Sequence, residues 1–239
     1  MVIRGIAVRT PLFATLVVVL LATLAVTFQL TVGAQGAGAE RCERFAQAAS
    51  ARAERDTSGE GPRVVVIGDS YSVGLRLDHP DRSWPSRLPG PVHVAGFSGS
   101  GFSARASACG RVSFADRAPH ALKRGADLVV VQGGLNDHDR TAAEIGAGFR
   151  ALVRAVGDRS LLVVGPPPAP VRGSEVGRVD AVLAALAARH GATYLSMVEA
   201  DLPYLDDGLH LTSEGHREFG DLVNESVLQV IEVQVPDGS

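Results

Sequence analysis

The sequence has few aromatic residues, two cysteines and a single lysine, Lys123. Basic and acidic residues nearly balance, giving a net charge of -3, and no long run carries one sign. Nucleic acids and other polyanions are bound by concentrated basic patches, which this distribution does not supply. We therefore expect no nucleic-acid partner. Internal repeats and low-complexity tracts are also absent, so the chain is not a repeat array.

Metal and cofactor signals are also missing. The histidines outside the motifs described below show no ligand spacing, so we expect no metal. The segment Gly99–Ala104 matches the dinucleotide-binding fingerprint in its letters, but it follows the second predicted strand, whereas the fingerprint follows the first. We therefore expect no cofactor.

The first 34 residues have the layout of an export signal. Arg4 and Arg9 precede a charge-free, mainly apolar run, Leu12–Phe28, and Val32–Ala34 supplies small residues suited to cleavage. The run exceeds the usual signal core and approaches the length that spans a bilayer. Residues 1–34 are therefore either a cleaved signal peptide or a membrane anchor. Both place the remaining chain outside the cytoplasm, with membrane contact only through this segment.

Cys42 and Cys109 would both lie on the exported side, where a disulfide can persist. A bridge between them would close a long loop, worth roughly 4 kcal/mol in the chain-entropy model. The alternative is two unpaired small hydrophobic residues, which suits Cys42 poorly because it lies beside a charged helix start.

The rest of the chain divides by composition. Residues 35–61 contain a Gly/Ala-rich linker, 35–40, and a short helix, 40–56. Residues 62–232 form one domain, which we expect to be monomeric, and residues 233–239 form a flexible tail.

Within this domain, short apolar runs alternate with stretches of helical periodicity, which predicts an α/β fold with a parallel sheet between two helical layers. The predicted strands are Val64–Ile67, Val92–Ala95, Leu128–Val131, Leu161–Val164 and Thr193–Leu195. The predicted helices are Thr141–Val156, Glu175–Arg189 and Ser213–Ile231.

Three glycine-rich loops follow the first three predicted strands. In an open parallel sheet, ligands bind beyond the carboxyl ends of the strands, where these loops would meet. The loops are Gly68–Ser72, Gly96–Gly101 and Gly133–Asp137. The proline cluster Pro166–Pro168 follows the fourth strand and is expected to form a rigid wall of the same cleft.

The loops contain the residues that nucleophilic catalysis needs. A serine hydroxyl requires a positioned base, and that base requires a partner to fix its tautomer. Asp207 and His210 are three residues apart on one loop, so the carboxylate can hold one imidazole nitrogen while the other faces Ser70. The backbone amides of Ser70 and Gly99 and the side-chain amide of Asn136 are candidate donors to an oxyanion.

Four segments together resemble the SGNH (GDSL-type) hydrolases: Gly68–Ser72, Gly99, Gly134–Asp137 and Asp207–His210. They occur in the family's order within residues 62–231. Each is common alone, and the inference rests on their joint occurrence. Tyr71 stands where the family's nickname has leucine, and Gly99 has two neighbouring glycines that compete for its alignment.

The resemblance implies a three-layer α/β/α fold and ester hydrolysis through an acyl-enzyme, without a metal. It assigns Ser70 as nucleophile, His210 as base and Asp207 as its orienting partner, with Gly99 and Asn136 completing the oxyanion hole. We expect the substrate to be a small-molecule or glycan ester.

Two other functions stay open. An O-acyltransferase could use the same scaffold with a second alcohol as acceptor, and a non-catalytic envelope or carbohydrate-binding module could keep the fold without the chemistry. The polar segment Leu75–Leu88 favours a small or hydrophilic ester over a long lipid chain. His138 and Asp139 flank the third loop and are interpreted as solvated, and His216 is interpreted as structural.

Overall fold

The computed structural model describes residues 10–234, with the side chains of much of 10–36 left out. The chain divides into two units, residues 1–43 and 44–239, and each is considered by itself. The second unit holds a five-stranded parallel sheet with strand order β2-β1-β3-β4-β5. The strands are β1 (Val64–Gly68), β2 (Val92–Gly96), β3 (Leu128–Gln132), β4 (Ser160–Val164) and β5 (Thr193–Leu195).

Successive residues of the central strands point to opposite faces of this sheet, and both faces are buried. Val64 and Val66 of β1 pack in one core cluster, while Val65 and Ile67 pack in the other. Such strands are apolar throughout, which explains why they appear in the sequence as short continuous runs.

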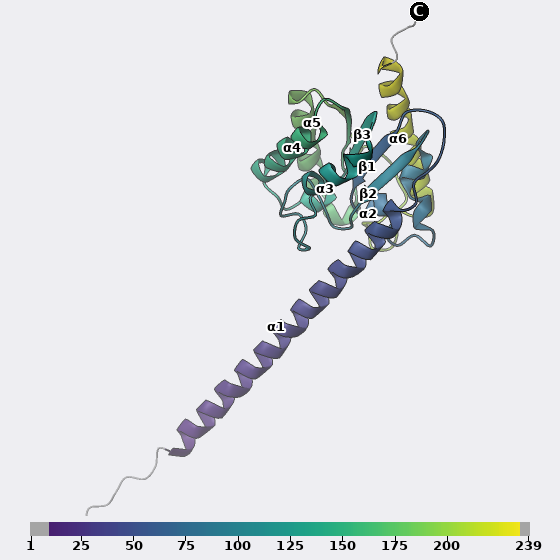
Figure 1. The fold of residues 1–239 in the computed structure, drawn as a ribbon. Helices are drawn as coiled ribbons and strands as arrows, with labels where there is room; N and C mark the ends of the chain where they lie inside the picture. Colours follow the sequence, from purple (N-terminus) through teal and green to yellow (C-terminus); the bar gives the residue numbers. More distant parts are fainter. Residues whose placement is uncertain (1–9, 235–239) are drawn as a thin grey trace, which may run out of the picture. The chain divides into compact units, whose positions relative to one another are not determined.

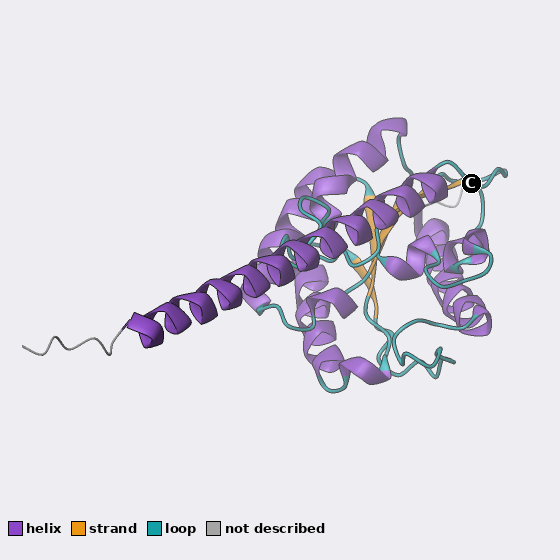
Figure 2. Cartoon of the chain, turned by 90° about the horizontal axis from the view of Figure 1, so that it is seen from below, coloured by secondary structure: helices purple, strands orange, loops and turns teal. Residues whose placement is uncertain are grey.

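Helices cover both faces (Figures 1 and 2). The first cluster includes α6 (Ser213–Gln234), and the second includes α3 (Phe114–Ala121), α4 (Ala142–Val156) and α5 (Glu175–Arg189). The short helix α2 (Ser70–Val73) follows β1 directly. The predicted three-layer α/β/α fold is confirmed, and the predicted strands agree with the observed ones to within one residue at each end.

The N-terminal segment differs from its prediction. Helix α1 runs from Thr10 to Ala53 and includes residues 35–40, which we expected to be a linker. The alanines of that stretch are strong helix formers and offset the cost of its glycines. The proposed signal or anchor lies partly outside the described residues, as does the tail 233–239. Among the residues that are described, no helix combines the length and apolar character needed to cross a membrane.

Cys42 and Cys109 are disulfide-bonded, as the first of the two alternatives predicted. This disulfide is compatible with an extracellular location.

A close backbone approach fixes the loop after β2 against α4. A Cβ atom at Gly148 would lie 1.9 Å from the carbonyl oxygen of Phe102. Only glycine allows this contact, which positions the segment that follows Gly99. Gly177 in α5 offers a contrast, because a Cβ there would meet no atom within 4 Å.

We predict opposite effects of alanine at these two helical glycines. Gly148→Ala forces the loop and helix apart and should lower the free energy of unfolding by about 2–3 kcal/mol. Gly177→Ala should raise it by about 0.5 kcal/mol through helix propensity alone. Urea denaturation of both variants measures the difference, and equal effects would contradict the proposed contact.

Candidate active site

Ser70 is the first residue of α2, directly beyond the carboxyl end of β1. Asp69 caps this helix, with its Oδ1 accepting a 3.0 Å hydrogen bond from the Tyr71 amide. A side chain at Gly68 would lie 2.0 Å from the Ser72 hydroxyl, so glycine is needed for this tight strand-to-helix turn. Ser70 is buried, with 8% of its surface exposed.

Asp207 and His210 interact directly. Asp207 Oδ2 lies 2.7 Å from His210 Nδ1, and Asp207 Oδ1 accepts hydrogen bonds from the Leu209 and His210 amides at 3.0 and 2.9 Å. Burial alone would raise the pKa of Asp207, but the bonds from the His210 ring and the two amides outweigh it and leave this pKa well below the usual range. The carboxylate is thus ionised and contacts Nδ1 on the edge of the imidazole ring.

Tyr71 connects the two halves of the candidate site. Its hydroxyl donates to the Leu209 carbonyl, and its ring centroid lies 6.4 Å from that of His210. Tyr71 is buried, and burial raises its pKa, so the hydroxyl keeps its proton and remains a donor. Tyr71, which stands at the leucine position of the GDSL motif, therefore joins the Ser70 helix to the His210 loop.

Ser70 and His210 are not hydrogen-bonded to each other in the described part of the chain. Catalytic hydrogen bonds are often long in ligand-free proteins and shorten when substrate binds. The predicted relay is therefore observed from His210 to Asp207, and its first link remains a prediction.

The second and third loops meet beside Ser70. Asn136 donates through its Nδ2 to the Ser100 carbonyl at 2.9 Å and more weakly to Asp69 Oδ2 at 3.4 Å. Gly99 adopts a φ of 78°, in the left-handed region that favours glycine. Asn136 thus contacts both of the other loops.

Asp137 is buried and holds the Gly-rich loop. Its two carboxylate oxygens accept hydrogen bonds from the amides of Phe102 and Ser103 at 2.9 and 2.8 Å. Burial raises the pKa of Asp137 to about 6, against the lowering effect of these two bonds. Burial likewise raises the pKa of Asp69 to about 6.

Arg117 is a buried contact of the candidate site that no sequence motif predicted. From α3, its guanidinium donates to the Ala95 and Gly68 carbonyls and to the Ser100 hydroxyl. These groups lie at the ends of β1 and β2 and in the second loop. Burial lowers the pKa of Arg117 to about 10, so it still carries its charge at neutral pH. Arg117 belongs to no motif, so only the fold brings it to this place.

Arg76 forms a second contact to the acid of the candidate relay. Its Nη1 lies 2.7 Å from Asp207 Oδ2, the same oxygen that binds His210. Arg76 has a φ of 72° and is the one non-glycine residue with positive φ in the described chain. This conformation costs free energy for a residue with a side chain, and such strain tends to persist at functional sites.

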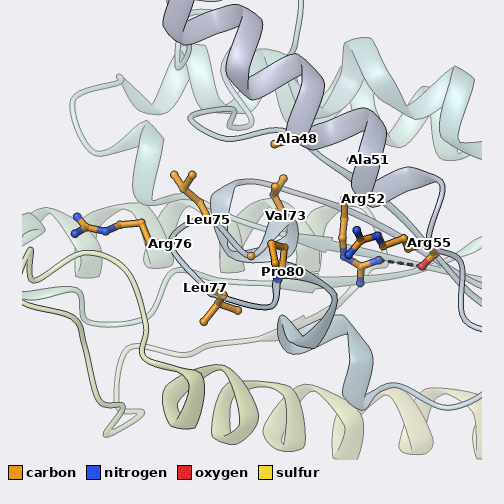
Figure 3. A pocket seen from close by; sticks show the side chains of 10 residues that line it. Ala48, Ala51, Arg52, Arg55, Val73, Leu75, Arg76, Leu77 and Pro80 are labelled. Carbon is orange, nitrogen blue, oxygen red and sulfur yellow. Dashed lines mark hydrogen bonds between the residues drawn. The ribbon is translucent and has the colours of Figure 1, made fainter.

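A cavity of about 210 Å³ lies beside the loop that follows α2 (Figure 3). Its walls come from Val73–Leu77, Pro80 and the last turns of α1 between Ala48 and Arg55. The amides of Gly74 and Leu75 both bond the Ser70 carbonyl at 3.0 Å, so the cavity begins about one helical turn from Ser70. Arg76 points away from the other labelled side chains (Figure 3).

The histidines near the motifs have distinct surroundings. His216 is buried, accepts from the Trp84 amide at 3.4 Å and has its pKa lowered to about 4 by burial, in agreement with a structural role. His138 contacts Arg172 and the Leu135 carbonyl, and its Nδ1 lies 3.9 Å from Asp139 Oδ1. Asp139 also pairs with Arg140. The described residues contain no cluster of three or more His, Cys, Asp or Glu suited to a metal.

Residues 66–218 match the GDSL-like Lipase/Acylhydrolase family. The chain is 30% identical over 158 residues to platelet-activating factor acetylhydrolase IB subunit alpha1 from Homo sapiens, covering 59% of this chain and 61% of that protein. The match therefore spans less than two thirds of this curated relative.

Solved structures share the fold. A carbohydrate acetylesterase from Sinorhizobium meliloti aligns with a TM-score of 0.60 and 23% identity, covering 71% of this chain and 100% of its own. An aryl esterase from M. smegmatis aligns with a TM-score of 0.59 and 23% identity, covering 71% and 99%.

The raised pKa of Asp137 predicts that replacing this residue lowers the free energy of unfolding by an amount that depends on pH. The free carboxyl ionises near pH 4 in the unfolded chain but near pH 6 in the fold, so its contribution to stability is full below pH 4 and is lost as pH rises through 6. Asp137→Asn should therefore destabilise the protein most at pH 4, and its cost should shrink by about 2–3 kcal/mol by pH 7.

Urea unfolding of the wild type and Asp137→Asn at pH 4, 5.5 and 7 measures this cost. The contribution of His216 is common to both proteins and cancels in the difference. The charge of Asp137 helps to raise the pKa of Asp69, so the replacement also lessens the loss of stability that Asp69 causes as pH rises, which changes the cost in the same direction. A cost that stays constant or grows with pH would contradict the assignment.

Proposed function

Because the chain belongs to the GDSL-like Lipase/Acylhydrolase family, we propose that it is an exported carboxylic ester hydrolase whose nucleophile is Ser70. The observation that carries this proposal is the 2.7 Å contact between Asp207 and His210, which share a loop tied to the Ser70 helix by Tyr71. The carboxylate holds Nδ1 of the imidazole, which leaves Nε2 free to accept a proton.

The proposed reaction has two steps, which are acylation of Ser70 and hydrolysis of the acyl-enzyme. Ser70 Oγ attacks the ester carbonyl carbon while its proton passes to His210, and collapse of the adduct expels the alcohol, which takes that proton. Water then attacks the acyl-enzyme, gives its proton to His210, and the acid leaves as Ser70 recovers its hydrogen. Asp207 remains ionised throughout and stabilises the imidazolium.

The developing oxyanion would be bound by the amides of Ser70 and Gly99 and by Asn136 Nδ2. Support comes from Asn136, whose amide already contacts the Ser100 carbonyl beside Gly99 and the Asp69 carboxylate beside Ser70. Arg117 contacts the same two loops, because its guanidinium donates to the Gly68 carbonyl and to the Ser100 hydroxyl.

We further propose a small acyl group, such as acetyl. The names of the human relative and of the Sinorhizobium meliloti structure, an acetylhydrolase and an acetylesterase, agree with this choice. The disulfide and the apolar N-terminal run favour export, whether secreted or anchored.

The proposed function predicts that a fluorophosphonate probe labels the wild-type protein at Ser70 and that Ser70→Ala abolishes labelling. Wild type should cleave 4-nitrophenyl acetate, and Ser70→Ala should lose the activity. Ser72→Ala is the matched control for a hydroxyl two residues away, although it removes a bond to Gln132 and so requires a check of folding. A folded wild-type protein that neither labels nor cleaves short esters would refute the proposal.

Arg76 predicts a change in kcat of the same reaction. Its guanidinium and the imidazole of His210 contact one carboxylate oxygen at 2.7 Å each, so the contacting nitrogens are at most twice that distance apart. Arg76→Gln removes a charged contact that helps to hold this carboxylate, so kcat of ester cleavage should fall by about two- to fivefold, whereas Arg76→Lys should keep more of the activity.

Arg87→Gln is the control for this measurement. It breaks an ion pair of similar exposure, to Asp221 at 2.6 Å, away from the proposed triad. A kcat that is unchanged in Arg76→Gln, or that falls equally in Arg87→Gln, would contradict a role of Arg76 at the proposed triad.

A further inference from the structure

A short turn after β4 lies against the loop that carries Asp207 and His210. The 3₁₀ turn Pro170–Arg172 follows the proline cluster, and its Val171 amide donates to the Gly208 carbonyl at 3.1 Å. Gly208 lies between Asp207 and His210 in the sequence. Arg172 is therefore adjacent to the loop of the proposed base.

The same arginine contacts the loop of the proposed oxyanion donor. Arg172 Nη1 lies 3.2 Å from His138 Nε2, and His138 comes two residues after Asn136. A guanidinium only donates, so His138 Nε2 must accept, and the ring hydrogen lies on Nδ1, which donates to the Leu135 carbonyl at 3.2 Å. The turn that carries Arg172 thus contacts the loop of the proposed base through the Val171 amide and the loop of the proposed oxyanion donor through His138, an imidazole that supplies no negative charge.

Arg172 lacks a counter-ion in the described part of the chain. Its Nε is buried without a hydrogen-bond partner, and no carboxylate lies within 4 Å of its guanidinium among the described residues. Nη2 has no partner either, yet it is not among the buried unpartnered atoms and so faces solvent. The neighbouring cations differ, because Arg178 pairs with Glu175 at 2.8 Å and Arg140 pairs with Asp139.

We infer that Arg172, held by His138, forms a subsite that binds a negatively charged group of the ester substrate, a carboxylate or a phosphate. The inference rests on the proposed function for its location and deepens it by naming a substrate class. Arginine suits this task because its planar donors match the geometry of both anions. Because the turn contacts both loops of the proposed site, the charge of Arg172 lies beside them.

Two pairs of esters test the inference, and the members of each pair differ only in charge. 4-Acetoxybenzoate and 4-acetoxybenzamide place the charge in the leaving alcohol, whereas 4-nitrophenyl hydrogen adipate and 4-nitrophenyl hexanoate place it in the acyl group. Wild type should favour the charged member of at least one pair by about tenfold in kcat/KM, as one solvent-facing charge-assisted bond allows. Rising salt should reduce this preference.

Arg172→Gln should abolish the preference by lowering kcat/KM for the charged member more than for the neutral member. Arg87→Gln is the control and should keep the preference, because that guanidinium is already paired with Asp221 and contacts neither loop. Equal losses for both members of a pair, or no preference for charge in wild type, would overturn the subsite.

Calorimetric titration separates this inference from the proposed function. 4-Hydroxybenzoate, adipate and 4-hydroxybenzamide are titrated into wild type and Arg172→Gln. If no ester is hydrolysed and Ser70 does not label, the proposed function fails, and binding still decides the subsite. Anions that bind wild type more tightly than Arg172→Gln support the subsite, and anions that bind neither protein, or both equally, refute it.

Discussion

The candidate site depends on one partly buried hydrogen bond, from the Tyr71 hydroxyl to the Leu209 carbonyl. Ser70 begins a short helix early in the domain, whereas His210 lies on a loop near its end, and 138 residues separate the two bonded groups. Tyr71 is fixed in turn by aromatic contacts to His216 and Phe219 of α6, at centroid distances of 5.8 and 6.0 Å. The packing of the last helix against the sheet therefore sets where the imidazole lies relative to the serine.

A second set of buried polar groups holds the remaining loops, and it carries a cost. Asp69 and Asp137 lie within the protein with pKa values raised to about 6, and Arg117 has its pKa lowered to about 10, each by burial. Their hydrogen bonds go to backbone amides and carbonyls of the glycine-rich loops. A loop that approaches another backbone closely has no side chains with which to pack, so such directional bonds are what give it one conformation.

Most of the fold could be predicted because each strand of a parallel sheet that is covered on both faces has a recognisable pattern within a few residues. Each strand is a short apolar run that ends at a polar or glycine-rich loop, so strands and candidate loops could be located together. The helix α3 was missed because it has only eight residues and contains Pro119, and its capping box of Ser113 and Asp116 was the one available signal. Arg117 and Arg76 could not be found from sequence, since their roles depend on strand order and on one left-handed backbone angle.

The proposed oxyanion pocket shows how a donor can be oriented before its ligand arrives. Asn136 Nδ2 carries two hydrogens, and the 2.9 Å bond to the Ser100 carbonyl occupies one of them and fixes the plane of the amide. The other faces Asp69 Oδ2 at 3.4 Å, a long contact that holds little energy. A developing oxyanion beside Ser70 would therefore compete only against that weaker bond. An amide held firmly by one partner and loosely by the other is already oriented for a third, which lowers the reorganisation needed when charge develops.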